Sequence, residues 1–269
     1  MSSRYTDPQR QMPPGPVLLC VAHPGHELRV HGWLSLARPA VCVLTDGSGR
    51  SGESRLETTR ALVGSAGAAV GPVFGRLRDE EAYAAILGRR ADVFIEIVDE
   101  LSAHIRDAGI LSVVGDAAEG YNSMHDVCRL ILNATVALVR RGGRDLSSYA
   151  FPLVGAPDES SGETEPGAVR VHLDDTRLEA KIAAARGYTS LTEDVEEALG
   201  RYGEDVFRVE CLWPAPVRAG DGLPDGPPFY ERHGERRVTE GKYPSVLRRH
   251  EHVLWLGAAL WRHAHPDGP

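Results

Sequence analysis

The sequence predicts an α/β protein: a Rossmann-like three-layer sandwich with a mostly parallel sheet and a C-terminal α+β extension. Two patterns and the length support this fold class. Short apolar runs alternate with amphipathic segments, the rhythm of a parallel sheet with helices on both faces. The first run, Val17-Leu18-Leu19-Cys20-Val21, is entirely apolar, as expected of a strand buried on both sides. With 269 residues, 42% of them hydrophobic, the chain is long enough for one large core.

The elements are expected in a regular order. A first strand at about 16–22 precedes a helix at 26–37, where apolar residues recur at helical spacing. The same alternation then repeats as a strand at 40–44, a helix at 53–66, a short strand near 72–77, a helix near 92–108, a strand at 110–114, a helix at 124–140 and a strand near 148–154.

The pattern changes after this point. Gly155–Gly167 and Pro214–Pro228 are rich in turn-forming residues and are expected to be loops. Between them a strand is expected at 169–173 and a helix at 174–187, with Asp174 or Asp175 as its N-cap and Gly187 at its end. The last segment, 243–263, has helical spacing. The predicted organisation is therefore a flexible tail at 1–15, an α/β domain at 16–212 and a C-terminal loop and helical extension at 213–269 that packs on the core.

The composition argues against several classes of binding partner and cellular location. A net charge of −8 argues against binding to nucleic acid or an anionic membrane, which needs concentrated Lys and Arg. The four cysteines are scattered without metal-site or disulfide spacing, and the polar N-terminus lacks the apolar core of a signal peptide. No apolar run reaches the roughly 20 residues that span a bilayer. We expect a cytoplasmic protein with a small-molecule substrate; a homo-oligomer remains open.

Three histidines follow two of the predicted strands. His23 and His26 lie directly after the first strand, and His125 follows the strand at 110–114 at the start of a helix. In parallel sheets, ligand sites form beyond the carboxyl ends of the strands, so these segments are expected to emerge at one edge. The sequence therefore predicts a three-histidine metal centre with an open fourth position.

These motifs resemble the LmbE/PIG-L family of zinc-dependent N-deacetylases. That family has Ala-His-Pro-Asp-Asp-Glu after its first strand, where this chain has Ala22-His23-Pro24-Gly25-His26-Glu27. The resemblance continues in order, over about residues 16–212, through Leu44-Thr45-Asp46-Gly47, Arg55-Leu56-Glu57, Asn122-Ser123-Met124-His125-Asp126 and the segment from Leu178 to Glu210. It implies a Zn²⁺ cofactor, with His23, His26 and His125 as the ligands.

Three departures from the family pattern fall on its chemistry. His26 stands where the family has a ligating Asp, Gly25 where it has its general base, and Asn122 where it has a histidine that stabilises the oxyanion. Three neutral imidazoles leave the ion its full charge, and such zinc centres bring the pKa of bound water to about 7. This partly compensates for the missing base.

The remaining roles are assigned to polar residues at the same edge. Asp46 and Glu119 are candidate catalytic acids, each weighed equally against a loop-capping role, and Asn122 is a candidate oxyanion donor. Arg55 matches a position that the family uses near its substrate. Asp116, a further acid expected to face the cavity, is grouped with it as substrate-binding.

The predicted function is a metal-dependent hydrolase, an N-deacetylase or amidohydrolase acting on a small N-acylated amino sugar or glycosylated metabolite, with metal-bound hydroxide as nucleophile. The alternative is a non-hydrolytic descendant of the family that keeps the metal for another reaction or for binding only. The ligand set also suits other divalent transition metals, and zinc is preferred through the resemblance.

Overall fold

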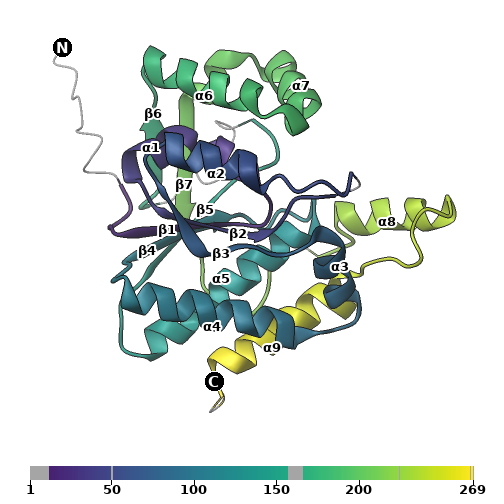
Figure 1. The fold of residues 1–269 in the computed structure, drawn as a ribbon. Coiled ribbons are helices and arrows are strands. Elements are labelled where there is room, and N and C mark those ends of the chain that lie inside the picture. Colours follow the sequence, from purple (N-terminus) through teal and green to yellow (C-terminus); the bar gives the residue numbers. More distant parts are fainter. Residues whose placement is uncertain (1–11, 50, 157–165, 224, 267, 269) are drawn as a thin grey trace.

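The computed structural model describes residues 12–49, 51–156, 166–223, 225–266 and 268. Most of the predicted N-terminal tail, 1–11, and part of the predicted loop at 155–167 lie outside these ranges. The described chain contains one seven-stranded sheet in the order β3-β2-β1-β4-β5-β7-β6 (Figure 1). Its strands are β1 (Val17–Val21), β2 (Ala40–Thr45), β3 (Ala69–Leu77), β4 (Ser112–Asp116), β5 (Ser147–Phe151), β6 (Val169–His172) and β7 (Val209–Pro214).

The sheet is mostly parallel, which confirms the predicted fold class. The first five strands, β1 to β5, run parallel to one another, and β7 runs antiparallel to both β5 and β6. β1 lies between β2 and β4, with Leu18 opposite both Ala40 and Val113. The chain segments that leave β1 and β4 therefore start side by side at one edge of the sheet.

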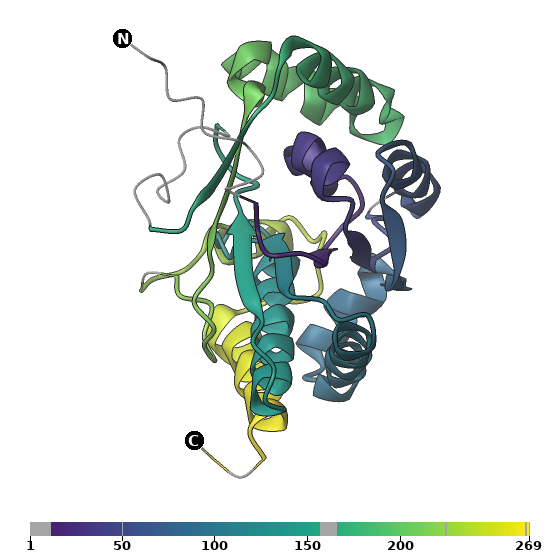
Figure 2. The same cartoon turned by 90° about the vertical axis from the view of Figure 1, so that its left-hand side faces the viewer.

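Helices cover both faces of the sheet (Figures 1 and 2). Alternate strand residues divide between two cores: Leu18 and Cys20 belong to one, and Leu19 and Val21 to the other. The first core packs against α3 (Asp79–Leu87), α4 (Ala91–Asp107), α5 (Ser123–Arg141) and α9 (Leu254–Ala264). The second packs against α1 (His31–Ala37), α2 (Leu56–Ser65), α6 (Asp175–Gly187) and α7 (Thr192–Tyr202).

The C-terminal segment contributes to the first core. α9 packs against α5 and α4, and its Leu256 and Leu260 are buried. At the crossing, a Cβ on Gly257 would lie 2.8 Å from the carbonyl oxygen of Ala219 and about as close to Leu130, so only glycine fits there. α8 (Phe229–Thr239) projects beside the carboxyl edge of the sheet (Figure 1).

Among the described residues, three α-helices and one β-strand were not predicted from the sequence: α3, α7, α8 and β7. α3 is short and begins with three acidic residues, which favour a helix N-terminus but leave only Ala82, Ala85 and Ile86 as its buried apolar side. β7 ends at a proline and pairs antiparallel, outside the strand–helix alternation. No helix in the described ranges has the length and apolar character needed to cross a bilayer.

Candidate metal centre

The three histidines meet at the carboxyl edge of the sheet. His23 lies two residues beyond β1, His26 opens a short helical turn (His26–Val30), and His125 lies in the first turn of α5. Their ring centroids are 5.3 Å apart for His23 and His26, 5.7 Å for His23 and His125, and 4.6 Å for His26 and His125. Three rings that bind one tetrahedral ion through nitrogen at about 2 Å have centroids roughly 5 Å apart. The observed separations match this value.

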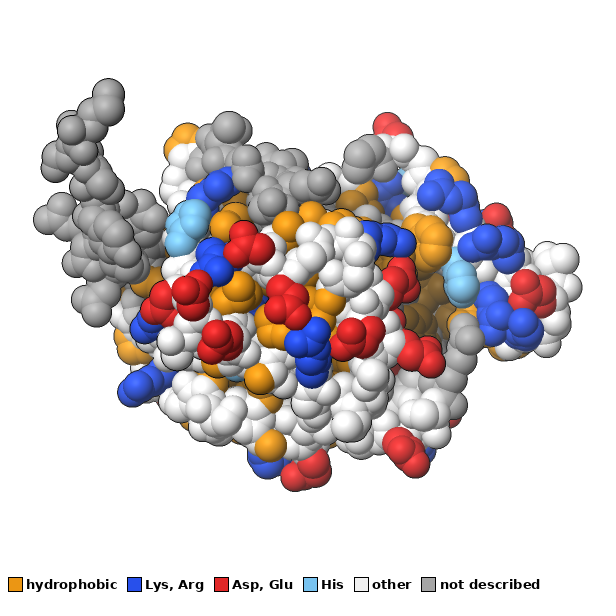
Figure 3. Space-filling model, turned by 90° about the horizontal axis from the view of Figure 1, so that it is seen from above, with side chains coloured by type: hydrophobic (Ala, Val, Ile, Leu, Met, Phe, Trp, Pro, Cys, Tyr) orange, Lys and Arg blue, Asp and Glu red, His pale blue; other side chains and the backbone are white. Residues whose placement is uncertain are grey.

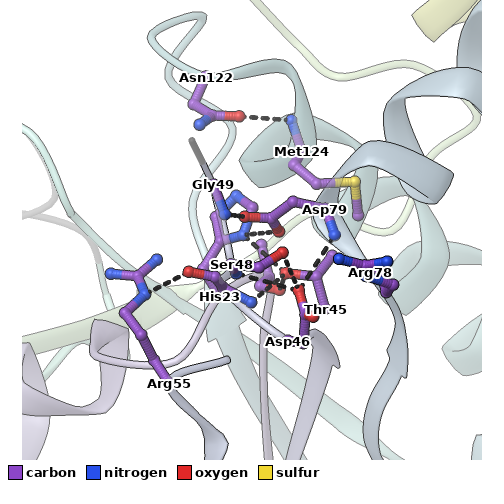
Figure 4. A network of polar contacts seen from close by, with 12 residues as sticks. His23, Thr45, Asp46, Ser48, Gly49, Arg55, Arg78, Asp79, Asn122 and Met124 are labelled. Carbon is purple, nitrogen blue, oxygen red and sulfur yellow. Dashed lines mark hydrogen bonds and ion pairs between the residues drawn. The ribbon is translucent and has the colours of Figure 1, made fainter. Parts of the chain in front are cut away.

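His23 is held by two polar groups (Figure 4). Its Nδ1 lies 2.8 Å from Oγ1 of Thr45 and 3.1 Å from Oδ1 of Asp79. The Thr45 hydroxyl donates to the carbonyl oxygen of Ala22, and a carboxylate only accepts, so Nδ1 of His23 carries the hydrogen. The other ring nitrogen, Nε2, is then an acceptor that is buried without a partner in the described structure. Its lone pair is available to a cation.

His26 is oriented in the same way by a second carboxylate. Its Nδ1 donates to Oδ2 of Asp116 at 2.9 Å, and the backbone N–H of Ala22 donates to the same oxygen at 2.8 Å. Asp116 is fully buried, whereas the His26 side chain is 16% exposed. Metal-binding histidines usually donate their second ring N–H to a carboxylate or carbonyl group. Two of the three rings follow this arrangement.

Burial keeps the imidazoles of His23 and His125 in their neutral, ligating form. It lowers the pKa of His23, and it lowers the pKa of His125 well below its usual value, with a further decrease from the neighbouring His26 and His23. Burial raises the pKa of Asp79, but the contacts with its polar neighbours, His23 foremost among them, together outweigh this effect and hold that pKa below its usual range. Nδ1 of His125 is also buried without a partner among the residues described.

The donor atoms are not yet arranged around a common point. Within the described ranges, no group of three or more His, Cys, Asp or Glu side chains has the geometry to hold a metal ion as it stands. The three rings of His23, His26 and His125, which we call the cage, have the right separation. Their side chains would have to rotate to bring the nitrogens together.

Asp46 and Asn122 have structural roles in the loops around this cage. Oδ1 of Asp46 accepts hydrogen bonds from the backbone N–H groups of Ser48 and Asp79 and from the Ser48 hydroxyl, so it caps a turn and the start of α3. Oδ1 of Asn122 accepts from the backbone N–H of Met124 and from the Tyr83 hydroxyl, which makes Asn122 the N-cap of α5. Its amide nitrogen makes no hydrogen bond to a described residue.

The other predicted site residues are divided between the cage and its surroundings. Asp116, predicted to bind substrate, is instead buried behind His26 and positions its ring. The Arg55 Nε donates to the carbonyl oxygen of Gly47 at 2.6 Å. The Glu119 carboxylate accepts from the backbone N–H groups of Leu153 and Val154, away from the histidines. Burial raises the pKa of Glu119, although these two N–H groups act in the opposite direction.

The sequence reasoning missed Asp79 and Thr45, the two partners of His23. Asp79 lies 56 residues from His23, at the start of a helix that the sequence does not indicate, so no local motif marks it. Thr45 directly precedes Asp46 and ends β2. Its position beside β1 in the sheet could have indicated a contact with the segment after β1.

Gly25 has a conformation that other residues rarely adopt. Its φ is 105°, and a Cβ added there would lie 2.4 Å from Cδ1 of Leu191. The loop is fixed further by Glu27, which is fully buried and accepts hydrogen bonds from the Gly25 N–H and the Thr59 hydroxyl. A side chain at position 25 would meet both backbone strain and an occupied space.

The surface is open beside the carboxyl edge. Viewed from above, it is hollowed between the body of the molecule and the segment that carries α8, with acidic side chains on the rim (Figure 3). The stacked rings of Tyr121 and Phe229, 4.9 Å apart, join the segment before α5 to α8. A separate cavity of about 350 Å³ is lined by Glu119, Arg129 and Trp213 among others, and none of the three histidines lines it.

Comparison with known proteins adds structural likeness only. No protein-family model matches the sequence, and no curated protein matches it. A triple mutant of a deacetylase involved in teicoplanin biosynthesis has a TM-score of 0.52 and 14% identity, over 74% of this chain and 97% of that one. A deacetylase of an antimicrobial pseudoaglycone has a TM-score of 0.49 and 14% identity, over 75% of this chain and 97% of that one. A deacetylase complex from the teicoplanin pathway has a TM-score of 0.49 and 13% identity, over 74% of this chain and 97% of that one.

Proposed function

We propose that this protein is a metal-dependent hydrolase, an N-deacetylase or amidohydrolase acting on a small N-acylated amino sugar or glycosylated metabolite. One observation carries the proposal: three imidazoles converge at the carboxyl edge of the sheet, and buried carboxylates orient two of them. The fold shared with a deacetylase of the teicoplanin pathway supports the class of reaction. The catalysed step is cleavage of an amide by water, which gives a carboxylic acid and a free amine.

The cage is suited to a divalent transition metal. His23, His26 and His125 supply neutral nitrogen ligands, and the buried Nε2 of His23 and Nδ1 of His125 have no other partner in the described structure. We infer Zn²⁺ as the ion, while three imidazoles also accept other divalent transition metals. Binding requires the rings to rotate so that their lone pairs meet.

When bound, the metal supplies an acidified water and polarises the amide carbonyl group. The residues of the chain prepare the site for this chemistry. Asp79 and Asp116 keep the Nδ1 hydrogens on His23 and His26, so that each ring presents its Nε2. The His26 side chain is 16% exposed, which leaves a route for substrate to the three histidines from the surface. The amide nitrogen of Asn122 is available to donate a hydrogen bond to the developing oxyanion.

Metal content and hydrolysis test the proposal together. Purified without a histidine tag, the protein is expected to contain about one equivalent of metal by elemental analysis and to release acetate from at least one N-acetylated amino sugar. His125→Ala should lose both properties and keep the circular dichroism spectrum of the parent. His172→Ala removes an exposed histidine on β6 and serves as the matched control. Unchanged metal content in His125→Ala would contradict the proposed ligand set.

A non-hydrolytic role is the second candidate, and the surroundings of Gly25 favour it. Position 25 cannot offer a base, because Leu191 fills the space that a side chain would need. The carboxylates of Asp46 and Glu119 are engaged by backbone N–H groups. If a panel of N-acetylated amino sugars stays intact under saturating zinc while metal binds stoichiometrically, this candidate is supported. Stoichiometric acetate release would exclude it.

A further inference from the structure

The cavity of about 350 Å³ is built from four chain segments that meet on the β4–β5–β7 side of the sheet. They are the loop after β4, the middle of α5, the end of β5 with its following loop, and the end of β7 with its following loop. Its volume falls within the range of roughly 300–1,000 Å³ that is typical of small-molecule sites. We call it the arginine cavity, because Arg129 and Arg218 both line it.

Arg129 is a buried cation without a paired carboxylate. Only 4% of the residue is exposed. Its Nε, Nη1 and Nη2 donate to the carbonyl oxygen of Asp116, the Ser148 hydroxyl and the carbonyl oxygen of Tyr149. These three acceptors are neutral, and a guanidinium carries five N–H donors, so two remain. The Asp116 carboxylate accepts its hydrogen bonds from His26 and the Ala22 N–H, and it forms none with the Arg129 side chain. Its influence on Arg129 is a longer-range electrostatic attraction.

A second cation, the exposed Arg218, also lines the cavity. The guanidinium of Arg218 lies against Gly222, whose φ is 78°, and a Cβ there would lie 1.8 Å from Nη2 of Arg218. The glycine therefore makes room for the arginine. In the part of the chain that the structure describes, the Arg218 side chain forms no hydrogen bond or ion pair.

The acidic groups of the cavity do not neutralise both arginines. Asp221 forms a bidentate ion pair with Arg249, with two contacts of 2.8 Å, so the charges of that pair cancel. Glu119 is the remaining carboxylate of the lining, and its oxygens accept the backbone N–H groups of Leu153 and Val154. Two guanidinium groups thus face one carboxylate, and the cavity has a net positive charge.

We propose that the arginine cavity binds a small organic carboxylate, at a site distinct from the three histidines. The two remaining N–H donors of Arg129 and the guanidinium of Arg218 receive the carboxylate, since planar guanidinium groups match its two oxygens. Trp213, Pro152 and Val154 line the same cavity and pack against an apolar body. A buried charge is ordinarily paired, and the ligand supplies the missing anion.

Benzoate and its neutral isostere benzamide test the proposal by isothermal titration of the full chain. Benzoate is expected to bind at least about tenfold more tightly than benzamide, because only benzoate supplies the charge. Arg218→Met should remove this preference, and Gly222→Ala, which displaces the guanidinium, should weaken it. Arg201→Met removes an exposed arginine on α7 and should change nothing. Equal binding of the two probes, or benzoate binding that is unaffected by Arg218→Met, would overturn the proposal.

The location of binding is tested separately, because a carboxylate can also bind a metal ion. The same titration is carried out after chelation of metals and in His125→Ala, and the preference for benzoate should persist in both. Benzoate should quench tryptophan fluorescence in the parent protein and much less in Trp213→Phe. Loss of binding in His125→Ala, with quenching retained in Trp213→Phe, would place benzoate at the histidines and reject the arginine cavity. Neither result depends on hydrolytic activity.

Discussion

The Nδ1 atom of His26 donates a hydrogen bond to Oδ2 of Asp116 at 2.9 Å, across 90 residues of sequence. The same oxygen accepts the Ala22 N–H, so one carboxylate joins the chain beyond β1 to the end of β4 and fixes the direction of the ring. This contact links the fold of the sheet to the chemistry of the cage.

Asp116→Asn is therefore expected to weaken metal binding by about 10–100-fold. The amide keeps the shape of the side chain but removes the charge that holds the Nδ1 hydrogen on His26. Competition with a chelator of known affinity measures the effect. Asp92→Asn, at an exposed position on α4, should leave metal affinity unchanged. Equal affinity of Asp116→Asn and the parent would remove Asp116 from the site.

Gly25→Ala is expected to destabilise the protein by about 1–3 kcal/mol. The substitution adds backbone strain at a φ of 105° and a contact with Leu191. Gly143→Ala is the matched control, because its φ is 83° and no atom lies within 4 Å of the added Cβ. Urea denaturation should show the larger loss for Gly25→Ala, and Leu191→Ala in the same chain should recover part of it. Equal losses at the two glycines would mean that Leu191 has no role.

Lys181→Met is expected to cost about 3–5 kcal/mol of unfolding free energy. Lys181 and Glu210 form an ion pair of 2.8 Å with side chains 4% and 0% exposed, and the substitution leaves a buried carboxylate without its cation. Arg201→Met, which breaks an exposed pair with Glu197, should cost less than about 1 kcal/mol. Denaturant unfolding of the two variants and the parent protein measures both changes in unfolding free energy. A neutral effect of Lys181→Met would show that the hydrogen bonds that Glu210 accepts from the Gly32 and Trp33 N–H groups are sufficient to stabilise its charge.

The four cysteines are expected to be unreactive in the folded protein. All of them are free and buried, and burial raises the pKa of Cys42 to about 12. A thiol reacts as its thiolate, so labelling with a thiol reagent at pH 8 should be slow in the native state and complete in denaturant. Rapid labelling of one thiol in the native protein would indicate local opening around it.

The fold could be predicted because its central elements are strongly patterned. β1 is apolar throughout, the segment 110–114 that leads into β4 is apolar except for Ser112, and α5 shows helical periodicity over nearly its whole length. α7 and α8 were missed because they bury few residues: Leu199 in α7 and Gly234 in α8. α8 therefore carries little hydrophobic signal. α7 is amphipathic and packs Val195, Ala198 and Tyr202 against the core beside Leu199, but it is short and these are its four apolar side chains.

The candidate site was predictable only in its innermost part. His23, His26 and His125 follow strands that are neighbours in a parallel sheet, so their meeting follows from topology, while their role as ligands stays a prediction. The groups around them depend on tertiary contacts. Asp79 reaches His23 from a helix that the sequence does not indicate, and Asp116 turned out to lie behind His26. The capping hydrogen bonds of Asp46 and Asn122 depend on loop geometry that residue types alone do not specify.

The packing of α9 against α5 has a practical consequence for anyone shortening the chain. Val253, Leu256 and Leu260 belong to the same core as Leu130 and Val127 of the helix that carries His125. A truncation after residue 212 would expose the apolar residues of α5 that α9 covers, and exposed apolar patches promote aggregation. A shortened chain intended for crystals or assays therefore needs to retain the last helix.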